Sequence, residues 1–314
     1  RISRVTSPQS SPMSEATHHA IVVGAGVAGL AAAGELARLG LEQGRLTALV
    51  DDGYLGGLIT NVGAVDGAPE GMGATGGDIV NALLEAALEA GADYRMGAAE
   101  SLVRDGELWR LPDMDLAAPA VVLATGARLR RLGVAGEEAL AGRGVSQCAF
   151  CDGGLYRGES VYVVGGGDAA FQEALHLAEL CGEVTLLIRG DAPRARAAYR
   201  ERAAGHANLH VQTNVEVLEI VGADGVEALR VAGPDGEATL PTRAVFPFVG
   251  LEPVADLAPA EAARDGEGAL LTDAHMATSL PGLYAIGAVR AGHGGEIADA
   301  LADATAAAAR IAGG

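Results

Sequence analysis

Two segments of the chain repeat one pattern: an apolar strand, a glycine-rich turn and a helical run. The first covers residues 20–40 and reads AIVV, GAGVAG and LAAAGELARLG; the second covers residues 160–181 and reads SVYVV, GGGDAA and FQEALHLAELC. Each copy is followed by another strand-like run, at 46–52 and at 183–189. Strands that alternate with helices form parallel sheets covered by helices. The sequence therefore predicts an α/β protein with two such sheets.

The apolar strands that follow each copy predict how the two sheets share the chain. A strand ending at a glycine turn lies between the copies (121–127), and similar strands lie after the second copy, at 245–251 and 282–288. An Ala-rich helix is expected at 296–311. We expect two Rossmann-like dinucleotide-binding domains with the second inserted in the first: residues 20–128 and 248–314 form one, and 129–247 form the other. The crossings near Gly126 and Gly250 would act as a hinge.

Charge and composition exclude several classes of function. The 314 residues carry a formal net charge of −19, and all 22 basic residues counted as Lys or Arg are Arg. Binding to nucleic acid is not expected, because neutralising phosphates requires a basic surface. No apolar run approaches the roughly 20 residues of a membrane span. Residues 1–19 lack the apolar core of a signal peptide, so we expect a disordered tail and a cytoplasmic protein.

The first glycine turn has the pattern of a pyrophosphate-binding loop. Gly24, Gly26 and Gly29 form G-x-G-x-x-G between a strand and a helix. In this pattern the first glycine allows the tight turn, the second allows close approach of a pyrophosphate, and the third lets helix and strand pack. An acidic residue at the end of the next strand binds ribose in such sites. Asp51 is the candidate, and Asp52 competes with it. The alternative is a tight turn without a ligand.

The second glycine turn also fits a dinucleotide, with fewer supporting residues. Gly165, Gly167 and Ala170 occupy the three positions of the pattern. The 2′-phosphate of NADP requires cations after the next strand. The sequence provides Arg189 and Arg194 there. The alternative is a domain that keeps the fold and binds nicotinamide nucleotide poorly or not at all.

A cysteine pair followed by an acid is the sharpest chemical feature. Cys148 and Cys151 form C-x-x-C, which places two sulfurs within disulfide reach near the start of a helical turn, where the thiol pKa falls. Asp152 follows at once and could move protons. Zinc would need two more ligands, and the only other cysteine, Cys181, is expected to be a buried small hydrophobe. We expect a redox-active pair and no metal site.

One histidine leaves two interpretations open. His293 lies in the glycine-rich turn before the final helix, where a cofactor would be approached. It is interpreted either as part of a surface loop or as a residue near the redox centre. His18 and His19 in the tail, and His176 in a helix, are expected to be structural or exposed.

Together these motifs resemble the low-molecular-weight thioredoxin reductases over almost all of residues 20–311. The anchors are GAGVAG, GGLIT at 56–60, ATGA at 124–127, GRGVSQCAFCDG at 142–153, VVGGGDAAFQEA at 163–174 and TSLPGLYAIGA at 278–288. The resemblance implies that the outer domain binds FAD and the inner domain NADPH, that the inner domain rotates, and that the protein is a homodimer.

The resemblance also implies roles for individual residues. Cys151 would face the flavin, Cys148 would attack the disulfide of the partner, and Asp152 would be the acid–base group. The final helix, starting at Glu296 and Ile297, would direct its N-terminus at the flavin. The residues that would contact FAD are Gly24, Gly26, Gly29, Asp51, Gly57, Thr60, Ala124, Thr125, Gly126, Gly287, Glu296 and Ile297. Those that would contact NADPH are Gly165, Gly167, Ala170, Arg189 and Arg194.

Three departures from the family pattern bear on the cofactors. The basic H-R-R-x-x-x-R stretch reads Ile188 to Arg194 here and keeps only two of its arginines. The Gly-Asp whose carboxylate holds the flavin ribityl chain is Gly287-Ala288, so a hydrogen bond of about 1.5–3 kcal/mol is either missing or supplied by another residue. The E-N-W/F-P-G stretch reads GAVDG at 63–67. FAD is still expected, and the departures leave the electron donor open.

The sequence therefore predicts an FAD-dependent disulfide oxidoreductase that reduces a thioredoxin-like protein. The electron donor is NADPH or a ferredoxin. One alternative is a thiol oxidase of the same fold, in which a dithiol reduces the flavin and oxygen reoxidises it. Asp152 favours the reductase, because an oxidase would more naturally place a histidine beside the pair. The other alternative is a flavin-binding sensor without turnover, which retention of the full C-A-F-C-D-G motif opposes.

Overall fold

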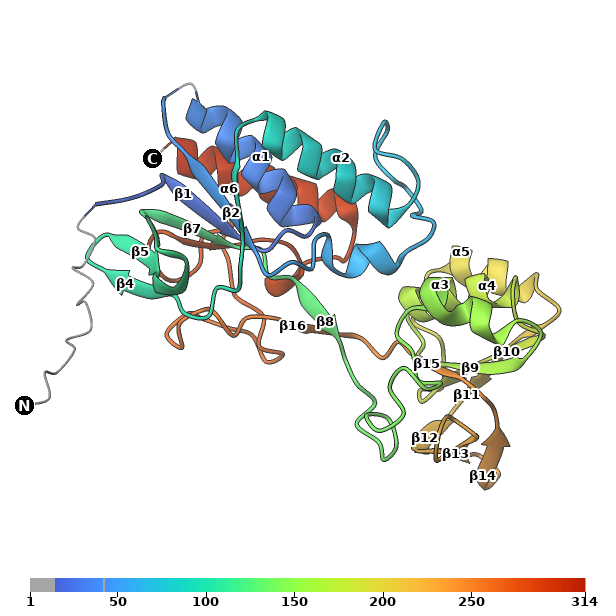
Figure 1. The fold of residues 1–314 in the computed structure, drawn as a ribbon. Helices are drawn as coiled ribbons and strands as arrows, with labels where there is room; N and C mark the ends of the chain where they lie inside the picture. Colours follow the sequence, from blue (N-terminus) through green and yellow to red (C-terminus); the bar gives the residue numbers. More distant parts are fainter. Residues whose placement is uncertain (1–14, 42, 314) are drawn as a thin grey trace, which may run out of the picture.

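The computed structural model describes residues 15–41 and 43–313 and divides them into a larger and a smaller unit (Figure 1). The larger unit is built on a five-stranded parallel sheet. Its strands, in spatial order, are β17 (Leu283–Ala285), β7 (Ala120–Leu123), β1 (Ala20–Val23), β2 (Thr47–Asp51) and β3 (Asp93–Met96). Because β17 comes from the C-terminal part of the chain, the last residues complete the sheet that the first residues begin.

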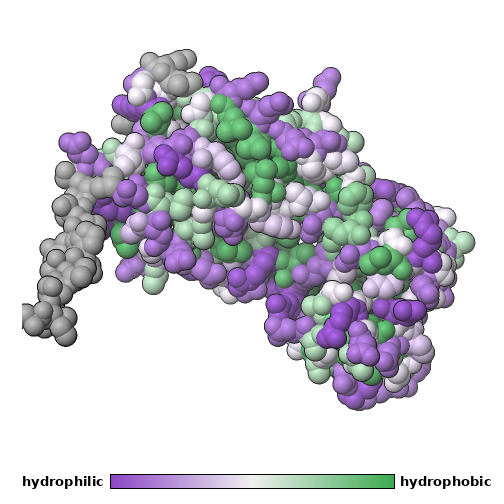
Figure 2. Space-filling view, viewed as in Figure 1, coloured by the Kyte–Doolittle hydropathy of each residue, from purple (hydrophilic) through white to green (hydrophobic). Residues whose placement is uncertain are grey.

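Helices cover one face of this sheet and a small antiparallel sheet covers the other (Figure 1). The helices are α1 (Val27–Leu41), α2 (Gly76–Glu89) and α6 (Ile297–Ala312). The opposite face carries β4 (Val103–Asp105), β5 (Leu108–Leu111) and β6 (Leu116–Ala118), with the short helix η2 (Pro112–Met114). Alanines dominate the buried contacts of α1 and α6, so the two helices pack closely. Figure 2 shows hydrophobic residues gathered over this helical layer.

The smaller unit holds a four-stranded parallel sheet and an antiparallel meander. The parallel sheet has the order β11 (Leu209–Thr213), β10 (Glu183–Ile188), β9 (Ser160–Val164) and β15 (Val245–Pro247). Its helices are α3 (Ala149–Asp152), η3 (Gly153–Tyr156), α4 (Asp168–Ala178) and α5 (Ala197–Ala204). The meander is β12 (Glu216–Val221), β13 (Ala228–Gly233) and β14 (Gly236–Pro241).

The chain passes between the units twice, and the two passages pair with each other (Figure 1). Strand β8 (Ala127–Leu129) leads out of the larger unit, and β16 (Leu251–Pro253) returns antiparallel to it. Gly126 and Gly250 lie next to these strands with φ of 70° and 116°, values that favour glycine. The prediction of two α/β units, one inserted in the other, is confirmed. The hinge and the boundaries 20–128, 129–247 and 248–314 stay predictions.

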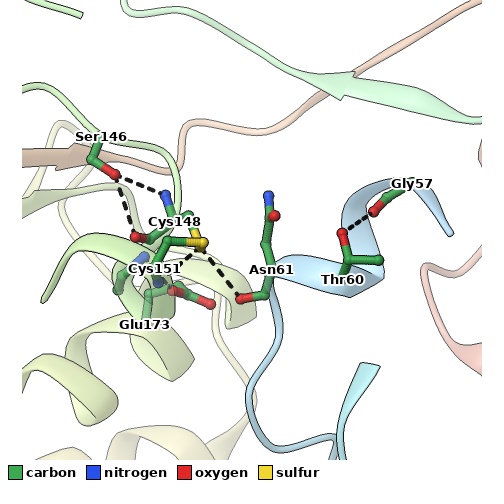
Figure 3. The surroundings of a disulfide bond; sticks show 8 residues. Gly57, Thr60, Asn61, Ser146, Cys148, Cys151 and Glu173 are labelled. Carbon is green, nitrogen blue, oxygen red and sulfur yellow. Dashed lines mark hydrogen bonds between the residues drawn. A yellow bond between two sulfur atoms is a disulfide. The ribbon is translucent and has the colours of Figure 1, made fainter. Parts of the chain in front are cut away.

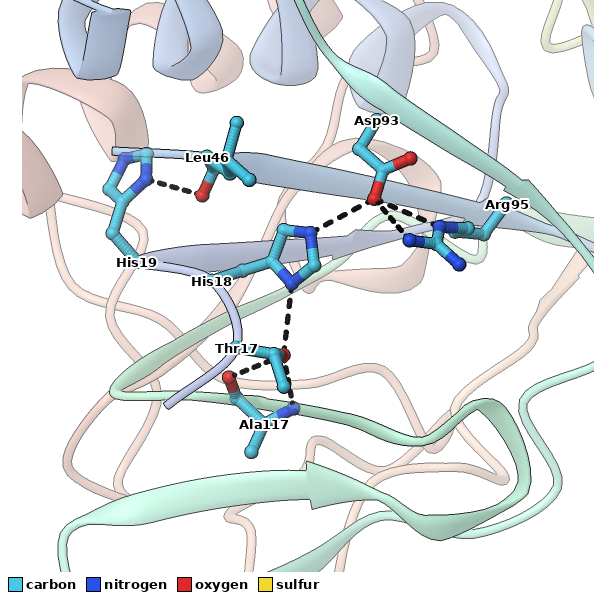
Figure 4. Close-up of polar contacts among 7 residues, drawn as sticks. All are labelled: Thr17, His18, His19, Leu46, Asp93, Arg95 and Ala117. Atoms are coloured by element: carbon cyan, nitrogen blue, oxygen red, sulfur yellow. Dashed lines mark hydrogen bonds and ion pairs between the residues drawn. The ribbon is translucent and has the colours of Figure 1, made fainter. Parts of the chain in front are cut away.

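Residues 17–19, just before β1, form hydrogen bonds with the rest of the larger unit (Figure 4). The prediction that all of residues 1–19 form a disordered tail is therefore wrong for these three. Residues 1–14 lie outside the described residues. Thr17 Oγ1 donates to Ala117 O at 3.1 Å, and His18 Nε2 lies 3.0 Å from Asp93 Oδ2. His18 is 7% exposed, so it is a buried structural residue. The lack of an apolar core in residues 1–19 favours a disordered tail, but the side chains of Thr17 and His18 find partners on strands distant in sequence. Within the described residues, no helix is long and apolar enough to cross a membrane.

Candidate active site

The first glycine turn joins β1 to α1 with the three contacts that the G-x-G-x-x-G pattern predicts. Gly24 has φ 104°, and a Cβ there would lie 2.4 Å from Ala124 O. A Cβ on Gly29 would lie 1.8 Å from Gly24 O, so only glycine lets the helix pack this closely. At Gly26 the nearest atom to such a Cβ is Gly56 O, at 3.8 Å. The second glycine therefore borders open space that a pyrophosphate can approach.

Asp51, rather than Asp52, lies at this turn. The Asp51 carboxylate accepts the N–H of Ala25 at 3.0 Å and that of Gly53 at 2.9 Å. Asp51 is 7% exposed, whereas Asp52 faces solvent. Each Asp51 oxygen can accept a second hydrogen bond. The structure thus favours Asp51 as the acid that would meet a ribose hydroxyl.

The other residues expected at FAD gather at the same edge of the sheet, because the carboxyl ends of parallel strands meet there. Ala124, Thr125 and Gly126 follow β7, and Gly287 follows β17. Gly57 and Thr60 lie on η1 (Gly57–Asn61), and Gly56 beside them forms a bridge with Gly26. The Cβ positions of Gly57 and Gly126 meet no atom within 4 Å among the described residues. This edge therefore leaves room for an extended ligand.

The N-terminus of α6 follows the turn that begins at Gly287. Its N-cap, Glu296, forms no side-chain capping bond, so the first N–H groups, beginning at Ile297, are offered to a ligand. Behind it, Asp303 is 3% exposed, accepts the N–H of Gly287 at 2.9 Å and pairs with Arg290 at 2.6 Å. A carboxylate is thus present beside Gly287, although Ala288 supplies none.

His293 is packed against this carboxylate rather than exposed. Its side chain is 9% exposed, and its Nδ1 lies 3.7 Å from Asp303 Oδ2. Nδ1 has no hydrogen-bond partner in the described structure. Burial lowers the pKa of His293, while Asp303 acts in the opposite direction. The loop is exposed at Gly292 and Gly294, as the surface-loop interpretation expects, but the His293 side chain is turned inward.

Cys148 and Cys151 form a disulfide at the start of α3 (Figure 3). Cys148 is the N-cap of α3, and its Sγ accepts the N–H of Cys151 at 3.0 Å. Ser146 Oγ accepts the N–H of Cys148 at 3.1 Å and fixes the backbone before the helix. A donor aimed at Cys148 Sγ would stabilise a thiolate there after reduction.

The two sulfurs of the pair differ in their surroundings. Cys148 is 9% exposed, and its Sγ lies 3.8 Å from Asn61 O of the larger unit. Cys151 is exposed, and Asp152 after it is half-buried. In this orientation of the units the accessible cysteine is thus Cys151, although the resemblance assigns attack on a partner to Cys148. Attack by Cys148 requires the contact with Asn61 to open.

A half-buried acid lies beside the disulfide helix. Glu173 of α4 accepts the N–H of Ala149 at 3.1 Å, and Figure 3 shows it beside the cysteine pair. Burial raises the pKa of Glu173 to about 7, and the Ala149 N–H offsets this only in part. Its charge therefore changes within the physiological pH range.

The second glycine turn repeats the geometry of the first. A Cβ on Gly165 would lie 2.2 Å from Phe248 O, whereas one on Gly167 would meet nothing within 4 Å among the described residues. Ala170 is fully buried beneath the turn. Arg189 and Arg194 are both exposed after β10, where a 2′-phosphate would be expected.

Several contacts join the smaller unit to the larger one around the disulfide. Besides Cys148 and Asn61, Gln172 Nε2 donates to Ala64 O at 3.0 Å, and Phe150 packs on Gly63. Tyr199 and Arg202 of α5 bind Asp66, and Arg196 pairs with Glu296 at 3.0 Å. The GAVDG stretch at 63–67, which departs from the family pattern, therefore contributes to the contact between the units.

Comparison with known proteins gives the family. The family model described as pyridine nucleotide-disulphide oxidoreductase matches residues 18–309. The thioredoxin reductase of Listeria monocytogenes is 37% identical over 284 residues, which cover 88% of this chain and 87% of the relative. The chain belongs to the thioredoxin reductase family. Thioredoxin reductases are FAD-dependent disulfide oxidoreductases, so the predicted fold, cofactor class and disulfide chemistry are confirmed.

Solved thioredoxin reductase structures also match the arrangement of the units. The Lactococcus lactis enzyme in its FR conformation superposes with a TM-score of 0.88, and that of T. acidophilum with 0.87. Each is 29% identical, and each match covers 94% of this chain and 98% of the other. The residues present fit FAD, since open space at Gly26, the Asp51 carboxylate and an α6 N-terminus without a side-chain cap are groups that a dinucleotide binds.

Sequence reasoning missed several residues of the site. Glu173 lies on the apolar stripe of α4 between Ala170 and Leu177, and Asp303 lies on that of α6 between Ala300 and Ala307. An acid on the buried face of an amphipathic helix was the signal that could have identified both. Asn61 and Arg196 carry no such signal, because their partners lie far away in the sequence.

Proposed function

We propose that this protein reduces the disulfide of a thioredoxin-like protein through Cys148 and Cys151. The observation that carries the proposal is the disulfide at the start of α3, with Cys148 Sγ held by a backbone N–H and placed between the two units. FAD, when bound, supplies the electron pair that opens this disulfide. The names of the curated relatives support thioredoxin as the partner.

Residues 20–128 and 248–314 are proposed to bind FAD, and 129–247 to carry the cysteine pair and a nucleotide. Gly24, Gly26 and Gly29 would receive the pyrophosphate and Asp51 the ribose. The N–H groups that follow Glu296 would meet the flavin ring. The remaining contacts are assigned to Gly57, Thr60, Ala124, Thr125, Gly126 and Gly287, which border the same edge.

The exchange proceeds in two thiol–disulfide steps. Cys148 thiolate attacks one sulfur of the partner disulfide, which forms a mixed disulfide and releases the other partner sulfur as a thiolate. Cys151 thiolate then attacks Cys148 Sγ, restores the internal disulfide and releases the reduced partner. The Cys151 N–H stabilises the first nucleophile, and exposure of Cys151 leaves the second free to act.

Asp152 is proposed to return protons to the thiolates that leave. It is the residue after Cys151 and is half-buried at the end of α3. A carboxyl group within reach of a reacting thiol can act as its acid and base. Replacement of Asp152 by Asn should slow turnover by about 10²- to 10⁴-fold, the usual contribution of such a group.

The electron donor is proposed to be NADPH bound at Gly165, Gly167 and Ala170. Arg189 and Arg194 are exposed beyond β10 and would pair with the 2′-phosphate. Arg189→Ala and Arg194→Ala should raise KM for NADPH and leave KM for NADH unchanged. Equal effects on both nucleotides would contradict the assignment.

Anaerobic reduction of the holoprotein tests the donor and the direction of electron flow. Excess NADPH should bleach the flavin absorbance, and Cys148→Ser should retain bleaching but lose thioredoxin reduction. Bleaching by reduced ferredoxin alone would replace the proposed donor. Oxygen uptake driven by a dithiol without nicotinamide would support the oxidase, and unchanged activity in Cys148→Ser would support the sensor.

The homodimer and the cytoplasmic location are proposed from the family resemblance. Figure 2 shows hydrophobic residues over the helical layer of the larger unit, which supports an interface there. Light scattering of the purified holoprotein should give twice the chain mass of 31.5 kDa. A single chain mass at micromolar concentration would contradict the dimer.

A further inference from the structure

The Glu173 side chain joins α4 to the first residue of the disulfide helix. Its Oε2 accepts the N–H of Ala149 at 3.1 Å, and Ala149 is bonded directly to Cys148. Ala149 is fully buried, so this N–H has no access to solvent. Figure 3 shows the carboxyl on the α4 side of the cysteine pair. Glu173 therefore holds the end of α3 at which Cys148 lies.

The environment of Glu173 provides little else to stabilise a negative charge. The Ala149 N–H is its single hydrogen bond within the described structure, and no ion pair reaches it there. Ionisable groups on α4 and on the elements packed against it are Asp152, Tyr162, Asp168, His176, Glu183, Tyr199, Arg200, Glu201, Arg202 and His210. Among these described residues, none bonds to Glu173. Burial therefore outweighs this hydrogen bond and raises the pKa of Glu173 to about 7.

We propose that Glu173 is a positioning residue of the redox centre whose charge opposes that of the Cys148 thiolate. When the disulfide is reduced, two electrons and two protons give the dithiol. Loss of the Cys148 proton then places a negative charge on the side chain directly before Ala149, whose N–H binds the Glu173 carboxyl. Two like charges in a poorly solvated site disfavour each other, so the carboxyl takes up a proton as the thiol releases one. The total charge beside α3 stays constant.

This coupling has a direct consequence for the chemistry of Cys148. Ionised Glu173 raises the pKa of the thiol, and protonated Glu173 lowers it. Two like unit charges on neighbouring side chains of a partly buried site change an ionisation constant by about tenfold or more. The inference rests on the proposed nucleophilic role of Cys148, but it concerns the thiol itself and needs neither donor nor partner.

Alkylation of the reduced holoprotein tests the coupling. The rate of iodoacetamide addition to Cys148 is measured by peptide mass spectrometry from pH 5 to 10, in a Cys151→Ser background. Glu173→Gln keeps an oxygen acceptor for the Ala149 N–H and removes only the charge. We expect this variant to lower the pH midpoint of alkylation by about one unit and to abolish any inflection near pH 7. Glu179→Gln, which removes an exposed charge at the C-cap of α4, should leave the profile unchanged.

A second measurement uses the intact cysteine pair. Equilibration with dithiothreitol should show that Glu173→Gln favours the reduced pair by about tenfold, which corresponds to about 30 mV for a two-electron couple. Coincident profiles and equal equilibrium constants for Glu173→Gln and Glu179→Gln would overturn the proposal. An effect in Glu173→Ala alone would also overturn it, because it would show a purely structural role. The flavin spectrum of each variant verifies folding, and failure of thioredoxin reduction would not affect either result.

Discussion

The Tyr199 hydroxyl donates a hydrogen bond of 2.9 Å to Asp66 Oδ2, and this bond joins the two units of the molecule. Arg202 Nη1 reaches the same oxygen at 3.0 Å. Asp66 lies in the loop between η1 and α2, whereas both donors lie on α5. One carboxylate of the larger unit thus holds a helix of the smaller unit in the observed orientation.

Loss of the Asp66 carboxylate should favour other orientations of the units. An exposed ion pair contributes up to about 1 kcal/mol and a hydrogen bond a similar amount, so Asp66→Ala should shift the equilibrium by about 5- to 30-fold. Alkylation of Cys148 in the reduced protein, which requires opening of the Asn61 contact, should accelerate accordingly.

Asp235→Asn, in the exposed turn between β13 and β14, is the matched control for Asp66. It removes one carboxylate from the smaller unit far from the contact and should leave the alkylation rate unchanged. Equal rates in the Asp66 and Asp235 variants would show that this carboxylate does not set the orientation.

Two glycine substitutions should separate folding from FAD binding. A Cβ on Gly29 would lie 1.8 Å from Gly24 O, so Gly29→Ala should destabilise the larger unit and reduce soluble yield. Gly26→Ala meets no atom closer than 3.8 Å and should fold while losing FAD. Circular dichroism and the ratio of flavin to protein absorbance measure the two effects. Full flavin content in Gly26→Ala would contradict the placement of the pyrophosphate.

Asp303 should be a main support of the turn before α6. Its side chain is 4% exposed and that of Arg290 is 15% exposed, so removing one charge leaves the other poorly solvated. Such a loss costs about 3–5 kcal/mol. Asp303→Asn should therefore lower the melting temperature by several degrees and weaken FAD retention.

The exposed pair of Arg230 and Glu219 is the control for Asp303, since the side chains are 48% and 37% exposed. Glu219→Gln should change the melting temperature little, because exposed pairs contribute at most about 1 kcal/mol. A similar small change in Asp303→Asn would indicate that the turn does not depend on this carboxylate.

The raised pKa of Glu173 predicts a specific dependence of stability on pH. In the unfolded chain the carboxyl ionises near its ordinary pKa of 4.5, and in the folded protein at about 7. Between these values the unfolded chain releases a proton that the folded protein keeps, so stability is full below pH 4.5 and falls as pH rises to about 7. The loss amounts to about 3 kcal/mol.

Urea unfolding of the protein and of Glu173→Gln at a series of pH values measures this effect. The variant lacks the titrating group, so its stability relative to the unmodified protein should increase from pH 4.5 to about 7 and then stay constant. A difference that is independent of pH would mean that the Glu173 carboxyl ionises normally in the folded protein.

Local patterns in the amino-acid sequence determined much of this protein. The glycine spacing predicts the first turn correctly, because the closest steric contact of Gly29, with Gly24, lies within that turn and the helix that follows. The sequence also predicts that Cys148 and Cys151 can form a disulfide, because the two residues lie within one turn of helix. Both features depend on residues close together in the chain, so their geometry follows from spacing alone.

The tertiary structure decided what depends on residues far apart in the chain. Spacing alone could not choose Asp51 over Asp52, because the choice depends on which carboxylate reaches the N–H of Ala25 across two strands. It could not show that Cys148 is shielded by Asn61, since that contact depends on the orientation of two units. The partial burial of Glu173 likewise arises only where α3 packs on α4. Desolvation and contacts between distant segments are properties of the packed molecule, so only the fold could reveal them.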